Sequence, residues 1–149
     1  LVGHWETPPT DMAIWEQINL DAMELLSRKD YMIGSDAIPL GKFPHPRAYG
    51  TFPRVIGRFQ RKYGVMKLEQ TIQRVTENPA KRFNLKKRGN IREGYYADLV
   101  IFDPNTVMDN STYDDPIQYP SGILYVFVNG VLAVENNLST GSRSGRAVP

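Results

Sequence analysis

Hydrophobic residues near the start of the chain recur at helical spacing and then gather into one short run. Between residues 12 and 27 they lie largely three or four positions apart, which predicts helix, and Asn19 and Asp21 are expected to interrupt it into two pieces. The apolar run of residues 31–33 predicts a buried strand that stops at Gly34 and delivers Asp36 into a loop. A helix followed by such a strand is a half-unit of a parallel sheet or barrel.

The middle of the chain predicts three helices separated by turn residues. Residues 52–63 predict an amphipathic helix closed by Gly64, with apolar side chains on one face and basic ones mainly on the other. Residues 68–76 predict a second helix, and residues 78–83 a third with Pro79 at a first helical position. In the first of these helices the expected inward residues are Val55, Ile56 and Phe59, and the expected outward ones are Arg54, Arg58, Arg61 and Lys62.

The last third of the chain predicts strands. Residues 97–102 predict one strand, which ends at Asp103 and a proline. Residues 123–128 and 131–135 flank Asn129 and Gly130, a pair that is the strongest short hairpin signal in a sequence. The final ten residues are rich in Ser, Gly and Arg and predict an extended tail. Pattern alone therefore predicts a mixed α and β fold.

Composition narrows the classes of protein to which the chain can belong. Eighteen basic and 16 acidic residues nearly cancel, so we expect no nucleic-acid and no membrane partner. Without cysteine the chain forms no disulfide and no Cys-based zinc site, and a cytoplasmic location is expected. The 149 residues are fewer than the roughly 250 of a (β/α)8 barrel, and the first residue is Leu1. We therefore expect a piece of a longer protein.

Candidate chemistry gathers after the predicted strand at residues 31–33. An isolated Asp at a strand end is commonly a turn or N-cap residue, because its carboxylate can accept bonds from free backbone N–H groups. Here Asp36 is followed by a loop with three prolines that carries His45, Arg47 and Tyr49. Prolines restrict the loop backbone, and the side chains include an imidazole, a guanidinium and a phenol. This combination favours a functional site held in place by its scaffold.

These residues also belong to a resemblance that covers the chain from about Asp30 onward. The similar stretches are GSD, HPRAYGTFPR, RGNIREGYYADLVIFDP, DDPIQYPSGILYVFVNG and TGSRSGR. The first two resemble the last barrel strand and the following loop of N-acyl-D-amino-acid deacylases (D-aminoacylases), a branch of the metal-dependent amidohydrolase superfamily. The resemblance implies an α/β fold. Residues 1–88 would be the C-terminal portion of a (β/α)8 (TIM) barrel, and residues 89–149 part of a small β-sandwich domain.

The resemblance implies a zinc-dependent hydrolase that cleaves N-acyl-D-amino acids, its small-molecule substrates, into a carboxylate and a free D-amino acid. Asp36 would be the general base and acid, and a candidate metal ligand. Arg47 would bind the free carboxylate of the substrate by two parallel charge-assisted bonds. His45 and Tyr49 would support substrate binding, His45 by contacting the substrate or by holding the loop. The family's remaining zinc ligands are not in this sequence, so we expect this chain to be inactive alone.

Two other hypotheses about the function stay open. A related amidohydrolase could open a cyclic amide, as dihydropyrimidinases and hydantoinases do, although Arg47 favours a substrate with a free carboxylate. A non-catalytic β-rich interaction module with a helical lead-in fits the hairpin and the polar tail equally well. Ser35 is not expected to be a nucleophile, because no base is paired with it. His4 is a metal ligand or substrate contact in one interpretation and a packed or surface residue in the other.

Overall fold

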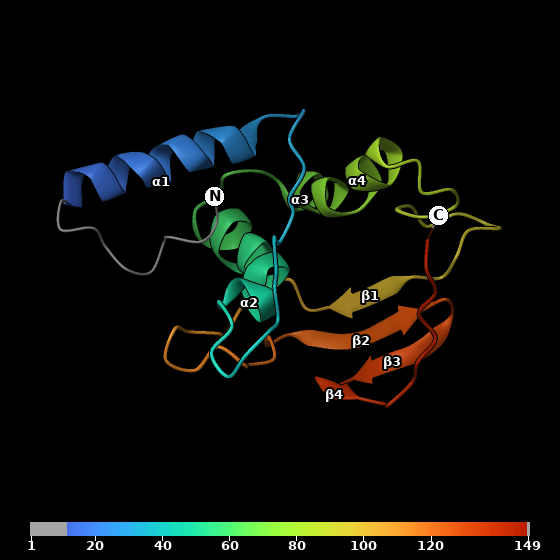
Figure 1. Ribbon diagram of the computed structural model, residues 1–149. Helices are drawn as coiled ribbons and strands as arrows, with labels where there is room; N and C mark the ends of the chain where they lie inside the picture. The colour runs from blue at the N-terminus through green and yellow to red at the C-terminus, as the bar shows by residue number, and fades with distance from the viewer. Residues whose placement is uncertain (1–11, 149) are drawn as a thin grey trace.

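The computed structural model describes residues 12–148 and shows helices on one side and a small sheet on the other (Figure 1). His4, a residue without an assigned role, lies outside the described residues. No helix among the described residues is both long enough and apolar enough to cross a bilayer. The elements are α1 (Met12–Ser27), α2 (Arg47–Arg54), the π-helix η2 (Val55–Lys62), α3 (Leu68–Val75), α4 (Glu77–Arg82), β1 (Leu99–Phe102), β2 (Ile123–Val128), β3 (Val131–Glu135) and β4 (Leu138–Ser139).

Helix α1 is continuous over 16 residues, so the predicted interruption at Asn19 and Asp21 is wrong. Asn and Asp each cost a helix less than about 0.7 kcal/mol relative to Ala, which two residues of this kind cannot turn into a break. The C-terminal end of α1 is held by Arg74, which lies on α3 and donates to the carbonyl oxygens of Leu26 and Ser27. Arg74 is buried, and this burial lowers the pKa of its guanidinium.

The strand predicted for residues 31–33 is wrong, although its burial is confirmed at Ile33. Residues 31–40 have no regular secondary structure. A parallel strand exists only where a neighbouring strand exchanges hydrogen bonds with it, and none lies beside this segment among residues 12–148. This segment is bonded to α3 through its backbone, from the Ile33 N–H to the Arg74 carbonyl, 3.4 Å away. Ile33 itself packs into the core against Val55 and Phe59.

Helix α2 begins at Arg47, five residues before the predicted start at residue 52. Pro46 already has helical backbone angles, φ −50° and ψ −27°, and it lacks an N–H that would need a partner at this point. His45 therefore precedes a helix, and Arg47 and Tyr49 lie on it rather than in a loop. Inside the helix Pro53 cannot donate a backbone bond, and the chain continues as the wider π-helix η2.

The next two helices follow the prediction closely. Helix α3 spans Leu68–Val75, which confirms the helix expected at residues 68–76. Helix α4 spans Glu77–Arg82, one residue earlier than expected, so Pro79 is its third residue and not its first. This position is still within the first turn, where backbone N–H groups have no acceptor in the helix.

The core lies between η2 and the segments that cross it. Val55, Ile56 and Phe59 are buried, as predicted. Arg54 is buried as well, so its predicted place on the outward face is wrong. Gly57 shows how closely η2 approaches its neighbour, because a Cβ at this position would lie 2.6 Å from the carbonyl oxygen of Val107.

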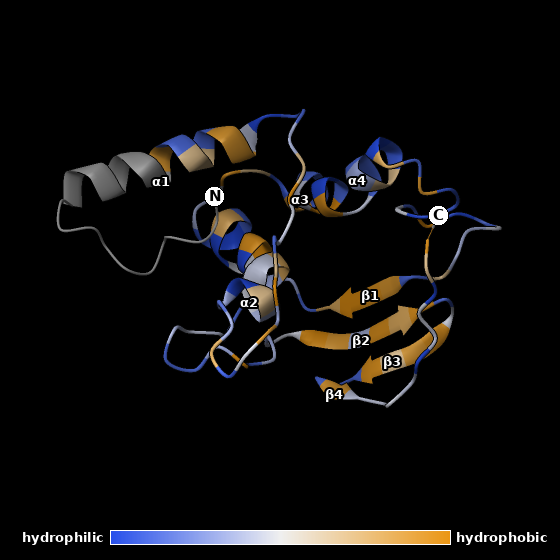
Figure 2. Cartoon of the chain, in the orientation of Figure 1, coloured by the Kyte–Doolittle hydropathy of each residue, from blue (hydrophilic) through white to orange (hydrophobic). Residues whose placement is uncertain are grey.

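The four strands form one antiparallel sheet in the order β1-β2-β3-β4, and Figure 2 shows that β1 to β3 are largely hydrophobic. The predicted bounds of β2 and β3 are confirmed, and β1 lies within the predicted residues 97–102. Asn129 and Gly130 have φ values of 50° and 81°, both positive as a two-residue type I′ hairpin requires. The short strand β4 was not predicted. It follows Asn136 and Asn137, which also have positive φ.

Residues 103–122, the connector between β1 and β2, place the sheet beside the helices. In Figure 1 the connector leaves the end of the sheet that lies near α2. It is closed on itself by a bridge between Met108 and Ser121. Arg61 of η2 donates to the carbonyl oxygens of Pro104 and Val107, at 2.9 and 2.8 Å. The connector is therefore bound to η2 through its own backbone.

Candidate active site

Asp36 and Arg47, the two residues singled out in the sequence, contact each other. The carboxylate Oδ2 of Asp36 lies 3.2 Å from Nη2 of Arg47. Asp36 comes from the irregular segment after α1, and Arg47 is the first residue of α2. The fold thus joins a carboxylate and a guanidinium that are eleven positions apart in the chain.

Asp36 is the exposed member of this pair, with 85% of its side chain accessible. It does not line the cleft described below, and its side chain contacts Arg47. Its φ of 47° lies in the left-handed region, which is uncommon for residues other than glycine but is tolerated best by Asn and Asp. Such backbone conformations cost of order 1 kcal/mol and cluster at functional sites.

Arg47 is half-buried and lines a small cleft at the start of α2. Its side chain is 24% accessible, and its Nε lies buried without a hydrogen-bond partner among the described residues. A buried donor without an acceptor costs about 1–3 kcal/mol, so this N–H is available for a ligand. The cleft is lined by His45, Pro46, Arg47, Gly50, Thr51, Arg54 and Asp109.

Both ring nitrogens of His45 have partners. Its Nδ1 lies 3.1 Å from the backbone nitrogen of Arg47, and its Nε2 lies 3.0 Å from the hydroxyl of Tyr113. A backbone N–H can only donate, so Nδ1 must accept, and in the neutral ring the proton is on Nε2. His45 therefore donates to Tyr113 and holds the start of α2. This geometry supports the interpretation that His45 holds the chain rather than contacts the substrate.

Tyr49 lies on α2 and packs against the connector. Its ring meets that of Tyr119 edge to face, with 6.4 Å between the centroids. Tyr49 is half-buried and is not among the residues that line the cleft. Its position supports packing of the helix rather than a contact with a ligand in the cleft.

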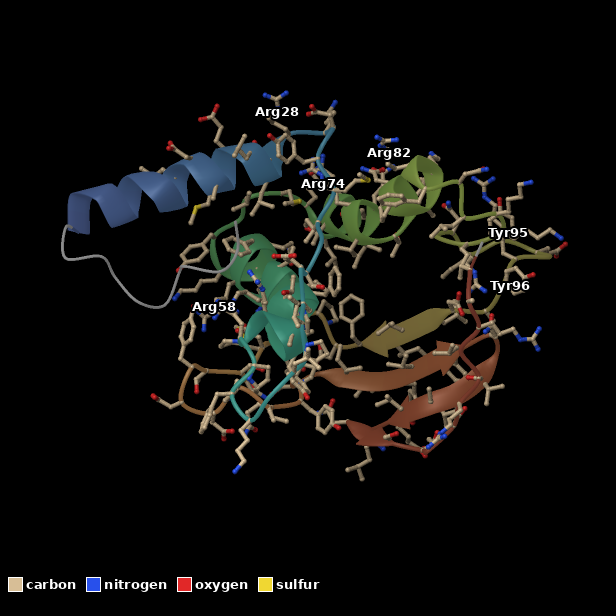
Figure 3. The ribbon with its side chains drawn as sticks, in the orientation of Figure 1. Arg28, Arg58, Arg74, Arg82, Tyr95 and Tyr96 are labelled. Atoms are coloured by element: carbon tan, nitrogen blue, oxygen red, sulfur yellow. The ribbon has the colours of Figure 1, made fainter. Side chains whose placement is uncertain are left out.

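A buried charge cluster below the cleft was not predicted. Nε of Arg54 donates to Oδ2 of Asp109 at 2.9 Å, and Nε of Arg58 lies 3.5 Å from the other carboxylate oxygen. Burial lowers the pKa of the Arg54 guanidinium, and the charge of Asp109 opposes this effect. In Figure 3 Arg58 lies on η2, on the side along which the connector passes. Asp109 is only 2% accessible, so α2 and the connector share a desolvated ion pair.

Sequence reasoning missed this cluster because its partners lie far apart. Arg54 and Asp109 are separated by 55 positions. Gly50 offered an indirect sign, since a Cβ there would come 3.0 Å from the Cβ of Asp109. A glycine in a helix costs about 1 kcal/mol relative to alanine, which suggests close packing but does not identify the neighbour.

Asp36 is the predicted metal ligand, and its carboxylate is exposed enough to bind a cation. Within residues 12–148 no three His, Asp or Glu side chains gather as a metal would require.

A family model, a related sequence and a solved structure all match this chain to amidohydrolases. The model of the amidohydrolase family matches residues 11–134. The D-aminoacylase of Alcaligenes xylosoxydans xylosoxydans is 42% identical over 128 residues, which are 86% of this chain and 26% of that protein. A crystal structure of D-aminoacylase matches with a TM-score of 0.84 and 43% identity, over 87% of this chain and 27% of that one.

A second solved structure adds a metal and a ligand. It is an N-acyl-D-glutamate deacylase from Bordetella bronchiseptica in complex with zinc and a phosphonate inhibitor that mimics the tetrahedral intermediate. It matches with a TM-score of 0.74 and 41% identity, over 76% of this chain and 24% of that one. This chain spans about a quarter of the length of the relatives that it matches.

Proposed function

Because the chain belongs to the amidohydrolase family, we propose that the protein containing it cleaves the amide bond of N-acyl-D-amino acids. The products are a carboxylate and a free D-amino acid. The observation that supports this proposal most directly is the contact of Asp36 with Arg47, in a chain 42% identical to a D-aminoacylase. One residue of this pair suits proton transfer, and the other suits the free carboxylate of such a substrate.

Arg47 binds the substrate carboxylate in this proposal. Its guanidinium presents donors in a planar fork that matches a carboxylate with two parallel bonds. Nη2 contacts Asp36 and Nε has no partner among the described residues, so the fork has a donor free for a second carboxylate. A substrate bound in this way would lie next to Asp36, which is where the scissile amide has to be.

Asp36 moves the proton. As water attacks the amide carbon, the carboxylate accepts a proton from that water, and it then gives the proton to the nitrogen that leaves. One C–O bond forms, one C–N bond breaks, and Asp36 ends in its starting state. Because the Asp36 side chain is exposed, a substrate and water can reach it.

We propose zinc as the metal of the complete protein, since a matching deacylase structure contains it. A bound zinc ion lowers the pKa of water and polarises a carbonyl group. Among the described residues Asp36 is the candidate ligand, and the other ligands would come from other parts of the protein. We also propose that residues 1–88 belong to a catalytic barrel and residues 89–149 to a small β-sandwich domain. The helices end at Arg82 and the strands start at Leu99, which supports this division.

The test uses the complete protein encoded with this chain. It is purified, stripped of metal with a chelator, and assayed with and without added zinc on N-acetyl-D-methionine, N-acetyl-D-glutamate, their L enantiomers and a hydantoin. We expect zinc-dependent release of the D-amino acid only. Hydantoin opening in place of this reaction would favour the cyclic-amide alternative. Inactivity on every substrate with zinc bound would favour a non-catalytic module.

A further inference from the structure

The connector contacts α2 from His45, just before the helix, to Arg54 at its last residue. Among the described residues this contact includes three pairs of side chains, and each pair joins one connector residue to one residue at or on the helix. They are Tyr113 with His45, Tyr119 with Tyr49, and Asp109 with Arg54. Of these connector residues, Tyr113 contacts His45, and His45 in turn bonds to the backbone of Arg47.

The backbone of Arg47 is held on both sides. Its N–H donates to Nδ1 of His45 at 3.1 Å, and its carbonyl accepts the hydroxyl of Thr51 at 2.8 Å. An N–H in the first turn of a helix has no acceptor within the helix, so it depends on a side chain such as this imidazole. If the ring of His45 rotated away, the N–H of Arg47 would lose that acceptor.

Tyr113 holds the ring of His45 in the required orientation. Its hydroxyl lies 3.0 Å from Nε2, and the two rings meet edge to face, with 5.2 Å between centroids and 79° between planes. Because Nδ1 accepts from Arg47, Nε2 donates, and the Tyr113 hydroxyl is its acceptor. The Arg47 N–H fixes the tautomer, and the Tyr113 hydroxyl then favours one rotation of the ring.

We propose that Tyr113 is a positioning residue for substrate binding, acting through His45 on Arg47. This inference rests on the proposed function, in which Arg47 binds the substrate carboxylate. Tyr113 touches no reacting group in this arrangement. Its effect is to keep the helix end, and with it the Arg47 side chain, in the conformation that receives the carboxylate.

The connector does not depend on the Tyr113 hydroxyl for its fold. It is bound to the helices separately, by the buried pair of Asp109 and Arg54 and by the two bonds from Arg61 to its backbone. Tyr113 is also partly exposed, at 39%. Removing its hydroxyl should therefore change the position of Arg47 without unfolding the connector.

The test is Tyr113→Phe in the complete enzyme, which keeps the ring and removes the hydroxyl. A hydrogen bond contributes about 0.5–1.5 kcal/mol, so we expect KM for an N-acyl-D-amino acid to rise by about two- to thirteen-fold, while kcat stays unchanged and the urea midpoint changes little. The matched control is Tyr119→Phe, which makes the same change on the same connector. It should leave KM unchanged, because its ring contact with Tyr49 needs no hydroxyl.

A second variant tests whether the effect passes through His45. His45→Asn retains a side-chain acceptor for the N–H of Arg47 but has no N–H at the place of Nε2. In this background Tyr113→Phe should not raise KM further, because the bond it removes is already absent. A further increase of the same size would overturn the proposal, as would a fall in kcat with KM unchanged.

The outcomes separate this inference from the proposed function. If the wild-type enzyme hydrolyses N-acyl-D-amino acids and Tyr113→Phe has the wild-type KM, Tyr113 has no positioning role and the proposed function stands. If the zinc-loaded wild-type protein hydrolyses none of them, both proposals fall.

Discussion

Asp36 and Arg47 contact each other, but the structure holds them in different ways. Asp36 lies on a segment without regular secondary structure and is 85% accessible. Arg47 begins a helix, is 24% accessible, and has its backbone bonded by His45 and Thr51. This chain thus preorganises the side of the site proposed to bind the substrate. The surroundings that would orient Asp36 and exclude water from it are not found among the described residues, so we expect other parts of the complete protein to supply them.

The largest effect should follow from Asp36→Asn, which removes the proton acceptor and, with it, the charge that contacts Arg47. Asn has the same shape and tolerates a positive φ as well as Asp does, so the backbone gains no strain. General acid–base catalysis contributes about 10²- to 10⁴-fold, and kcat of the complete enzyme should fall by that factor while zinc, measured by elemental analysis, stays bound.

The matched control for this change is Asp30→Asn. Asp30 is also exposed and is also paired with an arginine, Arg28, at 3.1 Å. Its loss should leave kcat unchanged. If Asp36→Asn turned over substrate at a rate near that of Asp30→Asn, Asp36 would not be the base.

The next largest effect should be a loss of stability from Asp109→Asn, which changes the buried ion pair between the connector and α2. Removing one charge of a buried pair leaves the other uncompensated and costs about 3–5 kcal/mol. Arg54 is the charge left behind, and it is almost fully buried. The urea midpoint of the complete protein should fall accordingly. KM should rise as well, because α2 loses its buried ion pair with the connector.

Asp103→Asn is the comparison for this stability effect. Asp103 lies at the start of the connector, where bonds from the Asn105 N–H and the Thr106 hydroxyl lower its pKa. Asn can still accept the backbone bond, so the midpoint should change little. Equal losses from the two variants would show that the buried pair with Arg54 is not what binds the connector to α2.

A smaller effect is expected from Arg47→Lys. Lysine retains the charge but not the fork, so the substrate loses one of two charge-assisted bonds, worth about 1.5–3 kcal/mol. KM should rise by about ten- to one-hundred-fold, with kcat close to that of the wild type. Arg28→Lys, at an exposed arginine paired with Asp30, is the control and should have no effect. A fall confined to kcat would argue that Arg47 acts on the reaction rather than on binding.

An element of this fold is predictable from the sequence to the extent that its interactions are local. The hairpin was predicted with its exact bounds, because Asn129 and Gly130 specify the turn without help from the rest of the chain. The start of α2 was missed, because the prolines around Pro46 were interpreted as loop residues. The strand at residues 31–33 was wrong because a strand needs a partner that a local pattern does not contain.

In the candidate site, too, contacts between residues close in the chain were predictable and contacts between distant residues were not. The pairing of Asp36 with Arg47 joins residues close in the chain, and the resemblance to deacylases drew attention to both. The contacts of Tyr113 with His45 and of Asp109 with Arg54 span 68 and 55 positions. A single sequence holds no record of which distant residues meet, so these contacts required the structure.

Gly57 has a consequence for how this region can vary. The bare backbone of η2 lies so close to the Val107 carbonyl that even a methyl group would overlap it. Any larger residue at position 57 therefore requires the backbone of the connector at Val107 to move away from η2. Such a movement would also change the positions of Asp109 and Tyr113, which lie on the same connector. Libraries built to alter substrate preference should hold position 57 constant and diversify the connector together with the helix.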